Sequence, residues 1–396
     1  MIELPVIHFD CVHFEGDRPC KPNKASGVFC DNCEFYEIDE SIKEPFPEIN
    51  DSIPSDKENK DYKQIIIIKL DAVGDVLRTT SILPSLKKKY PNSDIIWITR
   101  EKSFPVLQDN DLIDEIYFAE EELENIFAQD YDIAINLDSG RESCEIMNNI
   151  ISRESYGYYI AIGKPYPFNK QAMEWYLMSV DDNRKKANKK TYHKIIHEIC
   201  ALEYEGTKPQ LIITAEKRAI AKSIKENFGF QRYKQLILIN LGGGNRWQYK
   251  KWTKEGYAEL INLLAQSEPD KAIGVIAGDE DKDFYKEVLQ LVDRRENVIR
   301  FGCKNTTDDF ICIVYMADKI FTSDSLAMHI ATALEKYVVV IVGPTSHSEL
   351  DVFGKGEILY SDKVDCLVCY LNKCDKRVTC MNTIEAEDVF NFLSAR

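Results

Sequence analysis

The sequence has no long hydrophobic run and no net positive charge, the features that would associate it with a membrane or a nucleic acid. No apolar stretch in its 396 residues approaches the ~20 residues of a transmembrane helix. The N-terminus, MIELPVIHFDC, has no basic region followed by a long apolar stretch, so we expect no secretory signal. The formal net charge of −16 argues against non-specific binding of DNA or RNA. We therefore expect a cytoplasmic protein without a nucleic-acid partner.

Nucleotide-binding fingerprints are missing as well. No G-x-G-x-x-G follows the first strand of either half of the chain, and the run Gly242–Gly244 does not have Walker spacing. What is present is an ordinary globular composition, with 44% hydrophobic and 29% charged residues. A chain of this length suits two domains with small attachments.

The twelve cysteines are distributed unevenly. One set lies in the first tenth of the chain and reads C-x8-C-x9-C-x2-C: Cys11, Cys20, Cys30 and Cys33. A second set lies in the last tenth and reads C-x2-C-x4-C-x5-C: Cys366, Cys369, Cys374 and Cys380. In a reducing compartment, four thiols within ~20 residues suit zinc, iron or a small iron–sulfur cluster better than disulfides. We expect these metals to be structural, because such segments are too small for a core. Pairing between the two sets is the alternative.

Strand–helix alternation in the rest of the chain indicates two α/β halves. Continuous β-branched runs such as IIIIKL are typical of parallel strands buried on both faces. We expect strands at 65–70, 95–99, 115–118, 132–137, 235–241, 272–277, 319–322 and 338–342. We expect helices from 76 to Pro91 with a kink at Pro84, and at 254–267, 280–293, 307–317, 325–335 and 385–394, the last returning to the first half. Two such halves that face each other imply a cleft, with ligands at the carboxyl ends of the strands.

Three segments of the sequence, taken in their order along the chain, resemble the motifs of a known family. They read IIIIKLDAVGDVLRTTSILPSLKKKYP (65–91), ILINLGGGNRWQYKKWTKEGYAEL (237–260) and FTSDSLAMHIATALEKYVVVIVGPT (321–345). With their Gly-Asp-Val-Leu turn, Lys-x-Trp and Asp-Ser-x-x-x-His, they resemble glycosyltransferase family 9, the ADP-heptose:lipopolysaccharide heptosyltransferases. The resemblance covers roughly residues 63–390.

The resemblance implies a GT-B fold of two Rossmann-like, doubly wound domains facing across a cleft. Its boundaries would be 1–44 for a cysteine-rich metal-binding module that the family fold lacks, 45–62 for a linker, 63–205 for the acceptor domain, 206–360 for the nucleotide-sugar domain, and 361–396 for a cysteine-rich hairpin and C-terminal helix. Many family members carry a similar C-terminal cysteine cluster, and relatives that glycosylate bacterial adhesins resemble this chain in binding iron there.

The resemblance also implies the catalytic residues. Asp75 would be the base that takes the proton from the acceptor hydroxyl, and Gly74 would let the turn approach a substrate. Lys250 would stabilise the departing diphosphate, with Lys251 as a substitute if the alignment shifts by one. No Asp-x-Asp lies at a convincing strand end, so we expect inverting chemistry that is independent of a metal.

The implied donor site lies in the second half. Backbone N–H groups of a glycine nest and the start of a helix would hold the diphosphate. Glu280, with Asp279 as a competing candidate, would hold the ribose hydroxyls. The implied donor-binding residues are Gly242, Gly243, Gly244, Lys251, Glu280, Asp324, Ser325, His329, Gly343 and Thr345.

The partners that follow are a nucleotide-sugar donor and a glycan, glycolipid or protein acceptor, the most direct reading being heptose from ADP-heptose in lipopolysaccharide biosynthesis. The basic run 184–194 is a solvated loop or a patch for an anionic acceptor or the inner membrane face. Three alternatives stay open: the same fold with another sugar donor, an iron–sulfur oxidoreductase, and a non-catalytic sugar-nucleotide-binding protein.

Overall fold

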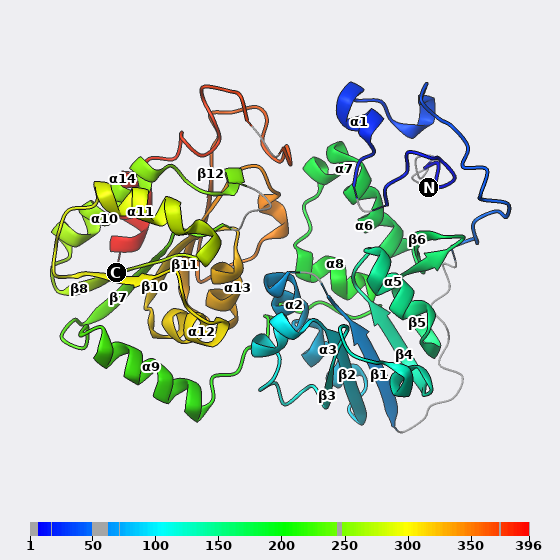
Figure 1. The fold of residues 1–396 in the computed structure, drawn as a ribbon, viewed down its shortest axis with the longest axis horizontal. Helices are drawn as coiled ribbons and strands as arrows, with labels where there is room; N and C mark the ends of the chain where they lie inside the picture. Colours follow the sequence, from blue (N-terminus) through cyan, green and yellow to red (C-terminus); the bar gives the residue numbers. More distant parts are fainter. Residues whose placement is uncertain are drawn as a thin grey trace. The chain divides into compact units, whose positions relative to one another are not determined.

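The computed structural model describes residues 7–16, 18–49, 62–70, 72–243, 248–371 and 374–395. It forms two compact units, each with its own sheet and helices (Figure 1). Unit 1 comprises residues 1–72, 81–104 and 111–207, and unit 2 comprises residues 73–80, 105–110 and 208–396. Most of the expected linker lies outside the described residues. In the described part of the chain, no helix has the length and apolarity of a membrane span.

The sheet of unit 1 has the strand order β3-β2-β1-β4-β5-β6. Its strands are β1 (Lys63–Ile68), β2 (Ser93–Thr99), β3 (Glu115–Phe118), β4 (Asp130–Asn136), β5 (Ile151–Ala161) and β6 (Lys164–Pro167). Only the β5–β6 pairing is antiparallel in this described sheet. The helices are α1 (Lys21–Ser26), α3 (Ile82–Lys89), α4 (Glu124–Phe127), α5 (Arg141–Asn148), α6 (Lys170–Val180), α7 (Asp182–Ala187) and α8 (Tyr192–Ile199).

The sheet of unit 2 has the order β12-β11-β10-β7-β8-β9 and is parallel throughout its described pairings. Its strands are β7 (Gln235–Asn240), β8 (Lys271–Ile276), β9 (Val298–Gly302), β10 (Lys319–Ser323), β11 (Tyr337–Val342) and β12 (Gly356–Tyr360). The helices are α2 (Val73–Thr79), α9 (Ala215–Asn227), α10 (Lys254–Ser267), α11 (Lys282–Leu291), α12 (Thr307–Met316), α13 (Leu326–Ala333) and α14 (Ala386–Ser394). The two parallel sheets confirm the doubly wound α/β class.

Two details of the predicted helices differ from the structure. The helix expected from residue 76 to Pro91 is two helices, α2 and α3, and the break lies at Thr80 and Ser81. Pro84 causes no kink, because it lies in the first turn of α3, where a missing N–H costs nothing. The expectation that the last helix returns to the first half is wrong. Val389 and Leu393 of α14 are buried in the core of unit 2 instead.

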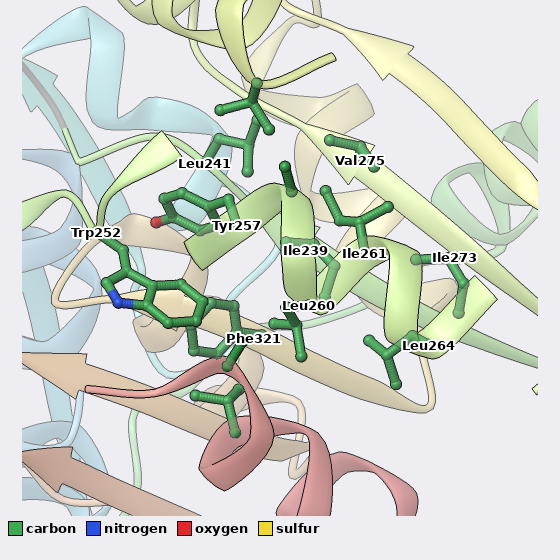
Figure 2. Close-up of a cluster of buried hydrophobic side chains, with 14 of the residues drawn as sticks. Ile239, Leu241, Trp252, Tyr257, Leu260, Ile261, Leu264, Ile273, Val275 and Phe321 are labelled. Carbon is green, nitrogen blue, oxygen red and sulfur yellow. The ribbon is translucent and has the colours of Figure 1, made fainter. Parts of the chain in front are cut away.

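An aromatic cluster anchors the core of unit 2 (Figure 2). Trp252, Tyr257 and Phe321 pack edge to face, with ring centroids 5.3 to 5.8 Å apart. The Trp252 indole N–H donates a hydrogen bond to the carbonyl of Ile384, 3.2 Å away, and this bond ties the segment before α14 to the cluster. Trp252 directly follows Lys250 and Lys251 in the sequence, so its burial fixes the backbone position from which those two lysine side chains extend.

Gly256 in α10 is required by this packing. A Cβ at position 256 would lie 2.6 Å from Trp252 Cε2. Alanine favours a helix over glycine by about 1 kcal/mol, but overpacking a core costs about 1–3 kcal/mol. We therefore expect Gly256→Ala to lower the free energy of unfolding, measured by chemical denaturation.

The double variant Gly256→Ala/Trp252→Leu separates the two effects. Because leucine removes the crowded ring, the Gly256→Ala change should be neutral or stabilising in the Trp252→Leu background, giving a measurable coupling energy. Equal effects of Gly256→Ala in both backgrounds would contradict the steric explanation.

Candidate functional site at the carboxyl ends of the second sheet

The strand order of unit 2 creates a switch point between β7 and β10. From β7 the chain adds β8 and β9 on one side, then returns to place β10, β11 and β12 on the other. In open parallel sheets, ligands bind at the carboxyl ends of the strands at such a point. The segments that leave these ends carry most of the predicted donor-site residues.

Lys250 and Asp324 form an ion pair at this edge. The Lys250 Nζ donates to Asp324 Oδ2 over 2.7 Å, and both side chains are largely buried. The Thr345 hydroxyl, which follows β11, donates to the same oxygen over 3.0 Å. Three segments far apart in the sequence therefore converge on one carboxylate.

Lys251 makes a separate ion pair with Asp281, a buried carboxylate at the start of α11. Asp281 Oδ2 also accepts a hydrogen bond from the Gly243 N–H over 3.3 Å. A Cβ at Gly242 would lie 3.0 Å from this oxygen, so glycine permits the close approach. The two adjacent lysines thus pair with two different carboxylates, Lys250 with Asp324 and Lys251 with Asp281.

A polar network connects β7 and β10 beneath the glycine run. The Asn240 side-chain amide donates to the Gly242 carbonyl, to the Thr322 hydroxyl and to the Ser325 hydroxyl, over 3.0, 3.0 and 3.2 Å. Among the described residues, the fully buried Ser323 hydroxyl has no hydrogen-bond partner. The network orients Ser325 at the N-terminus of α13 and leaves a hydroxyl beside Gly243.

Helix α2 brings Asp75 into unit 2 through its contact with α13. A Cβ at Gly74 would lie 2.8 Å from His329 Cδ2, so only glycine lets α2 pack this closely. Asp75 lies within α2 and pairs with Arg78 one turn later, over 2.8 Å. Both charges act on His329. The structure thereby groups Asp75, Arg78, His329, Asp324 and Lys250.

Burial and neighbouring charges settle the protonation states of this group. Burial, followed by the positive charge of Arg78, lowers the pKa of His329 to about 4 although Asp324 and Asp75 oppose the shift. His329 is therefore neutral near pH 7. Burial raises the pKa of Asp324, but the charge and hydrogen bond of Lys250, with smaller contributions from His329 and Arg78, together outweigh burial and hold that pKa well below its ordinary value. The site thus contains an ionised carboxylate, that of Asp324, and a neutral imidazole, that of His329.

The remaining predicted donor residues are placed less tightly. Glu280 is exposed, and its carboxylate folds back over Gly278; Asp279 beside it is also exposed. The predicted Gly244 lies outside the described residues. Gly343 opens the turn after β11, where a Cβ would lie 2.9 Å from Cys380 Sγ.

The C-terminal cysteine set supports that turn. The Tyr370 N–H donates to the Pro344 carbonyl over 2.9 Å, and the Tyr370 hydroxyl accepts from the Ser346 N–H over 3.1 Å. Burial, then the charges of Cys369, Cys366 and Cys374, raise the pKa of Cys380 to about 11, so these thiols are neighbours. The segment therefore braces the turn that carries Thr345.

The N-terminal cysteine set also gathers, within unit 1. Cys11, Cys20, Cys30 and Cys33 line one cavity of about 280 Å³. Across the described residues, no three His, Cys, Asp or Glu side chains converge closely enough to hold a single metal ion. The described cysteines are free thiols.

Several residues at these strand ends were not predicted from the sequence. They are Arg78, Asn240, Asp281, Ser323 and Tyr370 in unit 2, and the buried ion pair between Lys69 and Asp138 in unit 1. A polar residue at the end of an otherwise apolar strand was the available signal for Asn240 and Ser323, because the inner strands of such sheets are otherwise hydrophobic.

Comparison with known proteins identifies the class. A profile of glycosyltransferase family 9 (heptosyltransferase) matches residues 123–383. Lipopolysaccharide heptosyltransferase 1 of Campylobacter coli is 23% identical over 350 residues, which cover 83% of this chain and 98% of the relative.

Solved structures agree on the fold. The family 9 glycosyltransferase of Veillonella parvula matches with a TM-score of 0.70 at 18% identity, covering 85% of this chain and 98% of its own. The iron-containing dodecameric glycosyltransferase TibC of enterotoxigenic E. coli matches with a TM-score of 0.52 at 13% identity, covering 84% of this chain and 75% of its own. These matches and the two parallel sheets define a glycosyltransferase of the GT-B fold. The chain belongs to glycosyltransferase family 9, the heptosyltransferase family.

The low pKa of His329 makes stability depend on pH. An unfolded histidine binds a proton below pH ~6.5, whereas folded His329 stays neutral until about pH 4. Protonation therefore favours the unfolded state, and the stability present above pH 6.5 is lost as the pH falls toward 4. The loss is about 3 kcal/mol for this group. We expect His329→Gln to flatten the curve of thermal midpoint against pH in this window.

A matched control is His13→Gln, which lies in the other unit and should follow the wild-type curve. An unchanged slope in His329→Gln would show that His329 is not the group that becomes protonated on unfolding.

Proposed function

We propose that this glycosyltransferase moves heptose from ADP-heptose onto the lipopolysaccharide core or a related surface glycan or protein acceptor, with inversion at the anomeric carbon. The observation that carries the proposal is the grouping of Asp75, Lys250, Asp324 and His329 at the switch point of unit 2. The names of the relatives support the sugar and the acceptor class. A cytoplasmic location, with peripheral contact at the inner membrane face, fits a lipid-linked acceptor.

The basic run 184–194 contributes less to such a contact than its composition suggests. Arg184 Nε lies 3.6 Å from Asp181 Oδ2, and Lys190 Nζ lies 2.6 Å from Glu198 Oε2. Two cations of the run therefore have carboxylate partners within unit 1. We therefore propose that the acceptor contacts Asp75 and the residues around it, and we give the basic run only a secondary role, at the membrane surface.

Asp75 is the proposed general base. Its carboxylate takes the proton of the acceptor hydroxyl while the hydroxyl oxygen bonds to the anomeric carbon, and the bond from that carbon to the diphosphate breaks. About a third of the Asp75 side chain is exposed, so an acceptor can reach it. Arg78, paired over 2.8 Å, keeps the carboxylate oriented, and Gly74 keeps α2 against α13. Base catalysis of this kind contributes about 10²–10⁴-fold.

Lys250 is the proposed partner of the leaving diphosphate. A lysine is a flexible point charge, and the charge that Asp324 holds in place can be shared with phosphate oxygens. The N-terminus of α13 at Ser325, the N–H groups of Gly242 and Gly243, and the Ser323 hydroxyl are donors of the kind that phosphate oxygens accept from. Neutral His329 adds no charge to repel Lys250 or Arg78.

The rest of the donor site is proposed from its position. Glu280, or Asp279 beside it, is exposed and free to accept from ribose hydroxyls. Thr345 and Gly343 lie on the turn after β11, and Lys251, held by Asp281, fixes the glycine run from the other side.

Separate measurements of donor binding and turnover test this assignment. We expect ADP-heptose to bind more tightly than GDP- or UDP-sugars in calorimetry. Lys250→Ala should weaken binding and lower kcat by about 10²–10³-fold, since it removes charge stabilisation of the leaving group. Asp75→Asn should retain donor affinity and lower kcat by about 10²–10⁴-fold.

Lys254→Ala is the matched control, because Lys254 pairs on the surface with Glu287 and should alter neither quantity. The proposal fails if no nucleotide sugar binds, or if Asp75→Asn turns over at the wild-type rate.

We further infer that the C-terminal cysteines hold a structural zinc or iron ion. Four cysteines within one short segment are a suitable donor set for either metal, and metal binding would stabilise the Cys380 thiolate, which burial disfavours. The printed description of TibC as iron-containing supports iron. The ligands would be Cys366, Cys369, Cys374 and Cys380. Bound metal would supply no chemistry there, but would hold Tyr370 against the turn at Pro344 and Ser346.

This role predicts a link between the cysteines and donor binding. Cys369→Ser/Cys380→Ser should lose bound metal and bind ADP-heptose about tenfold more weakly, as expected when one or two hydrogen bonds of ~1 kcal/mol each to the turn are lost. Metal analysis and calorimetry measure the two effects. Cys312→Ser, a buried cysteine outside both sets, should change neither. Metal loss with unchanged donor affinity would remove the supporting role.

A further inference from the structure

The cavity in the N-terminal module has a lining that the transferase site does not explain. Its wall contains the four N-terminal cysteines, and the opposite side is formed by α6 and α7 through Leu177, Val180 and Arg184. All of these residues belong to unit 1. The site is therefore separate from the donor residues of unit 2 and needs an occupant of its own.

The module that carries these cysteines is firmly attached to unit 1. Phe9 stacks on Tyr176 with ring centroids 5.9 Å apart and meets Tyr166 edge to face at 5.0 Å. Lys24 and Asp182 form an ion pair of 2.6 Å. The cavity is thus bounded by anchored elements on both sides.

Local structure places each thiol at the cavity. Cys11 lies in a β-bridge with Ile38, and Cys20 immediately precedes α1. Cys30 begins a 3₁₀ helix, and Cys33 follows its end. Neither helix of the module buries a single residue, so apolar packing within it is slight. Segments of this size usually need a disulfide or a metal group at their centre.

The size of the cavity distinguishes a cluster from an ion. Thiolates around one zinc lie about 2.3 Å from the metal and close the space between them. Here the four cysteines, together with other residues of the module and of α6 and α7, line a cavity of about 280 Å³, room for several waters at roughly 30 Å³ each. Four thiols around such a space match the four-cysteine ligation of an iron–sulfur cluster.

The surroundings provide what a cluster with four thiolates requires. Arg18 and Arg184 line the same cavity and would offset the negative charge of the thiolates. Phe14, Leu177 and Val180 form an apolar part of the lining.

We propose that Cys11, Cys20, Cys30 and Cys33 bind an iron–sulfur cluster in this cavity, a site distinct from the C-terminal metal and from the transferase chemistry. The cluster takes the place of a hydrophobic core and joins the N-terminal module to α6 and α7.

The test uses the full chain purified without oxygen and, in a second arm, the apo chain treated with ferrous iron, sulfide and a thiol reductant. We expect iron together with acid-labile sulfide, and visible absorption that bleaches with dithionite. Native mass spectrometry of the unmodified chain should show the mass of the cluster without reliance on any variant. The mass and the electron paramagnetic resonance signal distinguish a four-iron from a two-iron cluster, and either supports the proposal.

Variants locate the group. Cys20→Ser/Cys33→Ser should lose the sulfide and the visible absorption, whereas the matched pair Cys366→Ser/Cys369→Ser should retain both. Zinc at these cysteines, iron without sulfide, an empty site in the wild-type chain, or sulfide that survives Cys20→Ser/Cys33→Ser would each overturn the proposal. Heptosyl transfer is assayed separately, so failure of the cluster and failure of the proposed transferase reaction are distinguishable.

Discussion

The largely buried carboxylate of Asp324 is the charge on which the arrangement of unit 2 depends. A buried charge is tolerated only when it is paired and hydrogen-bonded, and here Lys250 and Thr345 supply both from separate segments. Meeting this requirement brings the loop after the glycine run and the turn after β11 to the start of α13. His329, one turn into the same helix, is kept neutral first by burial and then by the positive charge of Arg78, although Asp324 and Asp75 oppose this. The electrostatic need of one residue thereby assembles a site that can receive a diphosphate.

The same reasoning explains why two adjacent lysines are not redundant. Trp252 is buried and hydrogen-bonded to Ile384, so the backbone before it has little freedom. From that fixed point Lys250 reaches Asp324 and Lys251 reaches Asp281. Each lysine neutralises a carboxylate that would otherwise be buried without a countercharge. In the proposed reaction the diphosphate would share Lys250 with Asp324 near α13, while Lys251 stays paired with Asp281. Lys250 and Lys251 therefore differ in role because they pair with different carboxylates, although both are lysines.

Much of this could be predicted from the sequence, and the failures have physical causes. Apolar β-branched runs identified the inner strands of both sheets, since burial on both faces leaves a continuous signal. β5, which reads ISRESYGYYIA, and the short β9 and β12 were missed because partly exposed strands lack that signal. The positions of Lys250, Asp324 and His329 were expected from motif resemblance. Their partners Arg78, Asp281 and Tyr370 were not, because pairing between distant segments depends on three-dimensional packing and leaves no local pattern.

The two cysteine sets also show a limit of prediction from sequence. In the sequence they differ only in spacing, and four thiols near one another suggest the same metal chemistry for both. In the structure they have different surroundings. The Cys380 thiol lies against Gly343, beside the turn that carries Thr345, and a single metal ion is the group proposed there. The N-terminal thiols line a cavity within unit 1 that residues of α6 and α7 also line, and a larger group is proposed there. The volume of that cavity, which no spacing encodes, is the observation from which the proposal of a cluster at the N-terminal set starts.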